Sequence, residues 1–124
     1  MAFGKKKIDL LYEELTYIIN GILFKVHNEL GRFAREKQYG DFVEKRLLEL
    51  AIPYEREVVI GNSGNILDFI VDRKVVLEFK AKPFLLKQDY YQLQRYLQVT
   101  GLRLGVLVNF RSLYLRPKRV LLSS

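Results

Sequence analysis

The chain has 124 residues, enough for one hydrophobic core, and we expect a single domain over residues 1–124. Lysine and arginine number 21 against 14 acidic residues, so the net charge is +7 and the basic surface suits phosphate-bearing partners. The lack of cysteine excludes disulfides and thiolate metal sites, and the single histidine excludes a histidine-rich zinc site.

Neither a membrane helix nor a signal peptide is predicted. No apolar run reaches the roughly 20 residues that a membrane-spanning helix needs, because polar residues interrupt the stretch 17–26. The lysines at positions 5–7 are not followed by an apolar segment and a cleavage site. We therefore expect a cytoplasmic protein.

The first predicted element is an amphipathic helix from Asp9 to about Asn28, with Asp9 as its N-cap. The helix ends near Gly31, and we expect His27 at its end to bond a carbonyl group rather than to act in catalysis. The apolar stripe recurs at spacings of three and four and consists of Leu11, Leu15, Ile18, Ile22 and Val26.

A second helix is predicted from Arg35 to Leu50. Glu36 extends its apolar stripe by one turn, and an acid on the buried side of a helix is costly unless it is capped, paired or bound to a metal. A favourable contact with the helix dipole accounts for Glu36 more simply. The stripe itself consists of Tyr39, Val43, Leu47 and Leu50.

Three antiparallel strands should follow, because β-branched and aromatic runs alternate with polar turns. The strands are predicted at Tyr54–Ile60, Ile66–Val71 and Val75–Lys80. The first turn is Gly61–Asn65, and the second is Asp72–Lys74.

The register of the second hairpin suggests a metal site. A turn centred on Arg73 places Val71 opposite Val75 and, in the same register, Asp68 opposite Glu78. Like charges so placed destabilise a sheet, and a hard divalent cation such as Mg²⁺ would offset their repulsion. These residues and Lys80 would instead be ordinary solvated charges if the face were exposed, but the apolar character of both strands favours a site.

The rest of the chain adds a helix and two strands. A loop at Ala81–Lys87 leads to a helix at Gln88–Thr100, with Tyr90, Leu93 and Leu97 facing inward and Gly101 ending it. Leu104–Phe110 is apolar on both faces, as in a covered central strand. The last strand, Leu113–Leu122, contains Pro117 and is expected at an edge.

This order of elements, with Asp68 and the triplet Glu78-Phe79-Lys80, resembles the αβββαβ core of the PD-(D/E)xK nuclease superfamily. The expected fold class is α/β, with an extra N-terminal helix and a C-terminal edge strand. Within that superfamily the chain resembles the GxxExxY protein family, although Phe33 and Arg111 stand where that family has glycine. The matching motifs are Val26–Gly31, Glu36 with Tyr39, Leu67–Ala81, Gln92-Leu93 with Tyr96-Leu97, Gly105–Phe110 and Lys118–Val120.

The resemblance implies a role for each residue of the site. Asp68 and Glu78 would bind Mg²⁺ or Mn²⁺, with the carbonyl of Phe79 as a third ligand, and Lys80 would be the catalytic lysine. Two further site residues are implied: Glu36, the acid of the second helix, and Gln92, a polar residue on the helix behind the site. The implied activity is hydrolysis of phosphodiester bonds in nucleic acid, with DNA ahead of RNA as the substrate.

Two other functions are compatible with the sequence. The domain could bind nucleic acid or protein without catalysis, because so short a chain has little surface for recognising a substrate unless a homodimer forms. It could also be a protein-interaction subunit. Nucleic-acid binding that is sensitive to salt but not to EDTA would indicate the binding domain without catalysis. A lack of nucleic-acid binding at low salt would indicate the protein-interaction subunit.

Overall fold

The computed structural model describes residues 11–123, which form three helices and five strands within that range. In chain order the elements are α2 Glu13–Leu30, α3 Glu36–Glu49, β1 Tyr54–Ile60, β2 Asn65–Val71, β3 Val75–Lys80, α4 Lys87–Thr100, β4 Leu104–Asn109 and β5 Lys118–Leu121. This order confirms the predicted α/β fold, with a helix before the αβββαβ core and an edge strand after it.

The strands form one mixed sheet in the order β1-β2-β3-β4-β5. Strands β3 and β4 are parallel, and α4 makes the crossover between them. The other neighbours are antiparallel. All six residues of β4 are buried, as predicted for a central strand that is covered on both faces.

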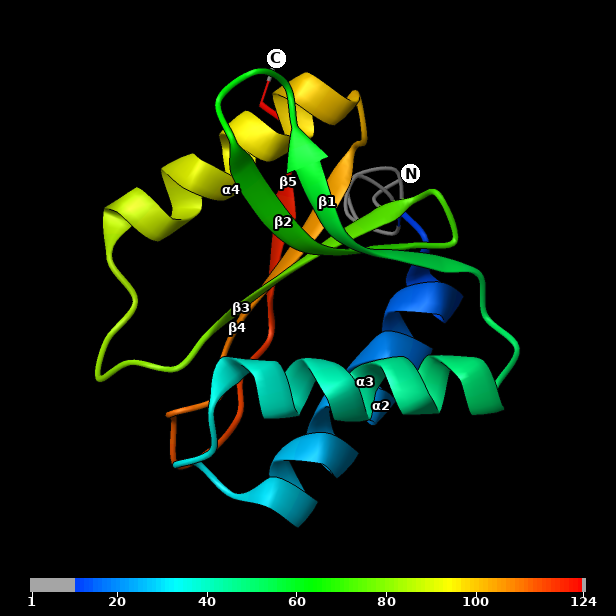
Figure 1. Cartoon of the computed structure of the whole chain (residues 1–124), viewed down its shortest axis with the longest axis vertical. Helices are drawn as coiled ribbons and strands as arrows, with labels where there is room; N and C mark the ends of the chain where they lie inside the picture. The colour runs from blue at the N-terminus through cyan, green and yellow to red at the C-terminus, as the bar shows by residue number, and fades with distance from the viewer. Residues whose placement is uncertain (1–10, 124) are drawn as a thin grey trace, which may run out of the picture.

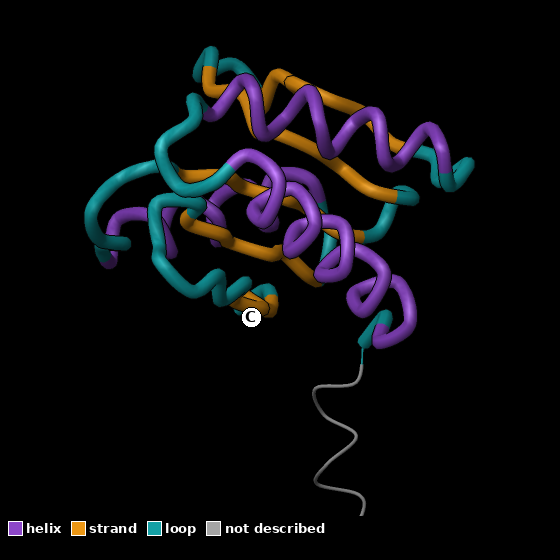
Figure 2. Tube along the Cα trace, turned by 90° about the horizontal axis from the view of Figure 1, so that it is seen from below, coloured by secondary structure: helices purple, strands orange, loops and turns teal. Residues whose placement is uncertain are grey.

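Helices cover both faces of the sheet. Helices α2 and α3 lie against one face, with α4 on the other, and Figure 2 shows the first two nearest the viewer. The core beneath α2 and α3 is aromatic at its centre: the rings of Tyr39 and Phe110 stack 4.1 Å apart, and Phe79 meets Phe110 edge-on at 5.2 Å. None of the helices within residues 11–123 has the length and hydropathy needed to cross a bilayer.

The first helix differs from its prediction. It begins at Glu13, after a turn in which Tyr12 has a positive φ of 53°, and the predicted cap Asp9 lies outside the described residues. Ile18 is 42% exposed and does not belong to the predicted stripe, whereas Ile22 and Val26 are buried and Leu11 and Leu15 pack against the core as predicted. His27 bonds a carbonyl as expected, that of Ser112 at 2.9 Å. The helix buries Thr16, Ile19, Ile22, Leu23 and Val26.

Two other boundaries also differ. Helix α3 ends at Glu49, so Leu50 leaves the buried stripe and is 45% exposed, while Ile52 packs against the core instead. The last strand covers only residues 118–121, not 113–122. Pro117 lies immediately before β5, where its missing N–H costs no ladder bond.

Candidate active site

Asp68 and Glu78 lie where strands β2 and β3 separate. The register is the predicted one: Val71 pairs with Val75, and the ladder continues to Phe69 and Leu77. Figure 1 shows the two strands diverging beyond this point, with β2 following β1 and β3 following β4. Asp68 and Glu78 are the next residues along the two strands, so their side chains lie at the fork.

Strands β1 and β2 are both distorted at Asp68. The ladder pairs Arg56 with Phe69 and Val58 with Leu67, and leaves out Glu57 and Asp68 between them. Glu57 has a positive φ of 55°, which is unfavourable for a side chain other than glycine. Such irregularities in a ladder redirect side chains and are frequent beside active sites.

Each acid bonds the backbone of the opposite strand. Asp68 Oδ2 accepts the Phe79 N–H at 2.6 Å, and Glu78 Oε1 accepts the Asp68 N–H at 3.2 Å. These two bonds take the place of the ladder bonds that the fork removes. The backbone thereby holds the two carboxyl groups side by side, in a position where only 4% of Glu78 is exposed.

This arrangement makes both acids hard to ionise. Burial and the neighbouring Asp68 carboxylate raise the pKa of Glu78 to about 9. Burial also raises the pKa of Asp68, although the Phe79 N–H and the Lys80 charge oppose that effect. At neutral pH Glu78 therefore carries a proton unless a cation replaces it.

Lys80 lies on the same face of β3 as Glu78, as the alternation of the strand predicts. Its Nζ is 3.7 Å from Glu78 Oε2 and donates to Gln92 Oε1 at 3.0 Å. The structure thus brings Gln92, from α4, to the lysine. A third contact is with Asp89, also on α4, at 3.8 Å.

Asp89 is a buried part of the site that sequence reasoning missed. It is 6% exposed, accepts the Leu86 N–H at 2.7 Å and forms an ion pair with Lys82 at 2.7 Å. Burial acts to raise its pKa, but the bonds from Leu86 and Lys82 prevail and lower it. The sequence does carry a signal for this placement, because Asp89 lies three residues before Gln92 and so shares its face of the helix.

Glu36 lies at the rim of the site. The prediction that it continues a buried stripe is wrong, because the residue is exposed at the first turn of α3. Partial burial and the Asp68 charge nevertheless raise the pKa of its carboxyl, against the effects of Lys80 and the Ala81 N–H. Glu36, Asp68 and Phe79 line a cleft of about 220 Å³.

The oxygen atoms at the fork fit a hard divalent cation. Two carboxyl groups of raised pKa lie together, one of them buried and the other half-buried, and a cation between them would relieve their repulsion. Within residues 11–123 no cluster of three or more His, Cys, Asp or Glu residues could hold a metal. Backbone carbonyl, water and phosphate oxygens would therefore complete the shell, as is common for Mg²⁺.

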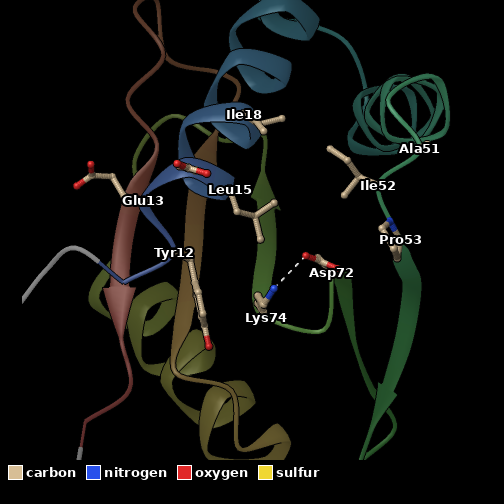
Figure 3. A pocket seen from close by; sticks show the side chains of 10 residues that line it. Tyr12, Glu13, Leu15, Ile18, Ala51, Ile52, Pro53, Asp72 and Lys74 are labelled. Atoms are coloured by element: carbon tan, nitrogen blue, oxygen red, sulfur yellow. Dashed lines mark hydrogen bonds and ion pairs between the residues drawn. The ribbon is translucent and has the colours of Figure 1, made fainter.

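A larger hollow lies elsewhere, between the start of α2, the end of α3 and the β2–β3 turn (Figure 3). Its volume is about 680 Å³, and Asp72 within it forms an ion pair with Lys74 at 3.2 Å. Asp72 is four residues from Asp68, about 13 Å along an extended strand. We place the candidate active site at the smaller cleft, because Asp68 and Glu36, two acids of raised pKa, line it.

Comparisons with known proteins bear on the fold and the family of the chain. A search of curated proteins found no match. The crystal structure of SSO0001 is similar, with a TM-score of 0.51 and 19% identity over 86% of this chain and 66% of that one. The chain spans slightly less than two thirds of that protein, and the likeness concerns the fold alone. The family model for the PD-(D/E)XK nuclease superfamily matches residues 13–120, and the chain belongs to that superfamily.

Proposed function

We propose that the protein is a metal-dependent nuclease that hydrolyses phosphodiester bonds in nucleic acid, DNA in preference to RNA, and that it is a GxxExxY member of the superfamily. The observation that carries this proposal is the pairing of half-buried Asp68 with buried Glu78, with the Lys80 ammonium 3.7 Å from Glu78. Membership of a nuclease superfamily supports it.

Asp68 and Glu78 are the proposed ligands of Mg²⁺ or Mn²⁺, together with the carbonyl of Phe79. The Phe79 N–H points to Asp68, and the N–H and carbonyl of one residue in a strand point to the same side. Bound there, the ion would lower the pKa of a water molecule and stabilise negative charge on the phosphate.

Lys80 would supply positive charge to the phosphate or orient the attacking water. Gln92 fixes the direction of this side chain, because its Oε1 accepts the bond from the ammonium. The amide N–H groups of Gln92 are suited to a phosphate oxygen. Glu36, exposed at the rim, would accept hydrogen bonds from water molecules that surround the site.

The test is cleavage of end-labelled DNA and RNA, single-stranded and duplex, with Mg²⁺, Mn²⁺ or EDTA. We expect cleavage with either metal and none with EDTA, and we expect Glu78→Ala to abolish it and Lys80→Ala to slow it by about 100- to 1,000-fold. Glu49→Ala is the matched control, because Glu49 is exposed and pairs with Arg46 at the end of α3. Equal cleavage by all variants would indicate a contaminant.

A domain that binds without catalysis would behave differently in the same experiment. Its binding of nucleic acid would be the same with metal as with EDTA and would not change on Glu78→Ala, and no metal would produce cleavage. That result would overturn the catalytic proposal while leaving the superfamily membership in place.

A further inference from the structure

Three loops meet beside the proposed site, at the lower left of Figure 1. They are residues 31–35 before α3, residues 81–86 after β3, and residues 110–117 after β4. Side chains tie them together: Arg32 Nε donates to the Arg111 carbonyl at 2.8 Å, and Arg111 donates to the Ala81 carbonyl at 3.2 Å. We call this surface the loop corner.

The loop corner presents aromatic rings to water. Phe33, Phe84 and Tyr114, one from each loop, are 73%, 76% and 75% exposed. Rings so exposed add little to the core, and Phe33 in particular contacts cations: the guanidinium carbons of Arg32 and Arg111 lie 4.9 and 5.4 Å from its centre.

The loop corner is adjacent to the catalytic groups. Arg111 bonds the carbonyl of Ala81, and the N–H of Ala81 faces Glu36. Ala81 directly follows Lys80 in the chain. Lys80 is therefore connected to the Phe33 ring through Ala81, which follows it in the chain, and Arg111, whose guanidinium lies over the ring.

Hydrogen bonds from the Asn109 side chain hold the bases of two of these loops in place. The buried amide of Asn109 bonds both the N–H and the carbonyl of Lys82, at 3.1 and 2.7 Å, which anchors the second loop where it leaves β3. The Arg111 N–H donates to the same Asn109 side chain at 3.2 Å. The rings and guanidinium groups are thus carried by loops whose bases are held in place.

An unpaired nucleic-acid strand has the chemistry that this surface would recognise. Its bases stack on exposed aromatic rings and on guanidinium planes, and its phosphates bind arginine. Bases inside a duplex are covered by their neighbours and cannot reach a ring on a protein surface without leaving the stack. The combination of exposed rings and arginines therefore favours unpaired nucleotides over duplex.

We propose that the loop corner binds unpaired nucleotides of the strand to be cut, with a base stacked on Phe33 and phosphates bound by Arg32 and Arg111. The proposal rests on the nuclease function for the use of the neighbouring site. It adds the substrate class, which is single-stranded or frayed nucleic acid.

The test measures binding without cleavage. A fluorescent oligonucleotide of one sequence, either single-stranded or annealed to its complement, is titrated with protein in EDTA and followed by anisotropy. We expect tighter binding of the single strand. Phe33→Ala should weaken that binding by about 5- to 150-fold, the effect of losing one stacked base, and leave duplex binding unchanged. Phe33→Trp should retain it.

Tyr17→Ala is the matched control. Tyr17 is 81% exposed but lies on α2 about 20 Å from Gly31, at a rise of 1.5 Å per residue. Thermal melting of each variant checks that it folds. Because Phe33 is exposed, its substitution should not impair folding. Arg111→Gln should weaken binding of the single strand and reduce its dependence on salt.

Equal affinity for single strand and duplex would overturn the proposal, and so would single-strand binding that Phe33→Ala leaves unchanged. A lack of any binding would also overturn it and would favour a protein partner for the exposed rings. These outcomes are distinct from failure of the nuclease proposal, in which the single strand binds through Phe33 but no metal produces cleavage.

Discussion

Asp68 and Glu78 each accept a hydrogen bond from the backbone of the strand that carries the other acid. Asp68 accepts the Phe79 N–H at 2.6 Å, and Glu78 accepts the Asp68 N–H at 3.2 Å. The backbone thus fixes two carboxyl groups close together before any ligand arrives. Five predictions follow from this pair and its surroundings.

The stability of the metal-free protein should fall as the pH rises. The pKa of Glu78 is raised from an ordinary 4.5 to about 9, so between these values the folded state binds more protons than the unfolded chain. The free energy of unfolding should then decrease by up to about 1.4 kcal/mol per pH unit. The stabilisation that comes from protonated Glu78 is complete below the ordinary pKa of 4.5, and it is lost as the pH rises through the folded-state pKa of about 9.

Urea unfolding in EDTA at a series of pH values measures this slope. Glu78→Gln should flatten it and be more stable than wild type at alkaline pH, because the amide cannot ionise. Glu49→Gln, at an exposed site, should keep the wild-type slope. The interpretation fails if Glu78→Gln leaves the slope as it was.

Divalent cations should stabilise the wild type and leave Glu78→Gln unaffected. A ligand at 100 times its dissociation constant adds about 2.7 kcal/mol to the free energy of unfolding. The effect should grow with pH, because the cation must displace a proton from the carboxyl pair. Melting temperatures with Mg²⁺, Mn²⁺ or EDTA measure it, and equal shifts in both proteins would place the ion elsewhere.

Lys80 and Gln92 should affect the rate of cleavage to different degrees. Lys80→Ala removes a charge that is presented to the phosphate, and we expect a loss of about 100- to 1,000-fold in kcat. Gln92→Ala leaves the ammonium without its 3.0 Å partner, and we expect about 10- to 100-fold. Single-turnover rates at saturating protein compare them. A larger loss for Gln92→Ala would reverse the assigned roles.

Asp89→Ala should destabilise the fold and slow cleavage together. The change leaves Lys82 and the Leu86 N–H without their buried acceptor, at a cost of about 1–3 kcal/mol. Asp89→Asn keeps an oxygen for the Leu86 N–H and should recover part of the stability. Denaturant titration measures both, and an effect below about 0.5 kcal/mol, typical of surface positions, would contradict the buried role.

Gly105→Ala should separate α4 from the sheet. A Cβ at Gly105 would lie 2.8 Å from Leu93 Cδ1, and Leu93 is fully buried, so its side chain would have to shift within the core. Overpacking of this kind costs about 1–3 kcal/mol. The double variant Gly105→Ala with Leu93→Ala should be less destabilised than the sum of the single changes, which a double-mutant cycle measures. Additive effects would mean that the two residues do not interfere.

Much of this arrangement could be predicted from the sequence because it is local. The turn at Asp72–Lys74 fixes the register of the hairpin, and with it the meeting of Asp68 and Glu78. Alternation along β3 then places Lys80 on the face of Glu78. The helical spacing of α4 places Gln92 toward the sheet, although the sequence does not specify its partner.

Other features depend on contacts between distant segments. The ion pair of Asp89 with Lys82 requires the loop before α4 to fold back onto the helix, and spacing alone does not predict that. The kink at Glu57 depends on the pairing of β1 with β2, because its residue type does not favour a positive φ. Leu50 was misplaced because helix α3 ends one residue before it and Ile52 packs in its place.

The parallel pairing of β3 with β4 has a consequence for how the site is assembled during folding. The two acids meet across a short hairpin, which can close early, whereas Gln92 and Asp89 reach Lys80 only after α4 crosses over and β4 docks. A nascent chain would therefore acquire the pair of carboxyl groups before it acquires a correctly held lysine. Competence for cleavage would be among the last properties to emerge, after the protein has become fully compact.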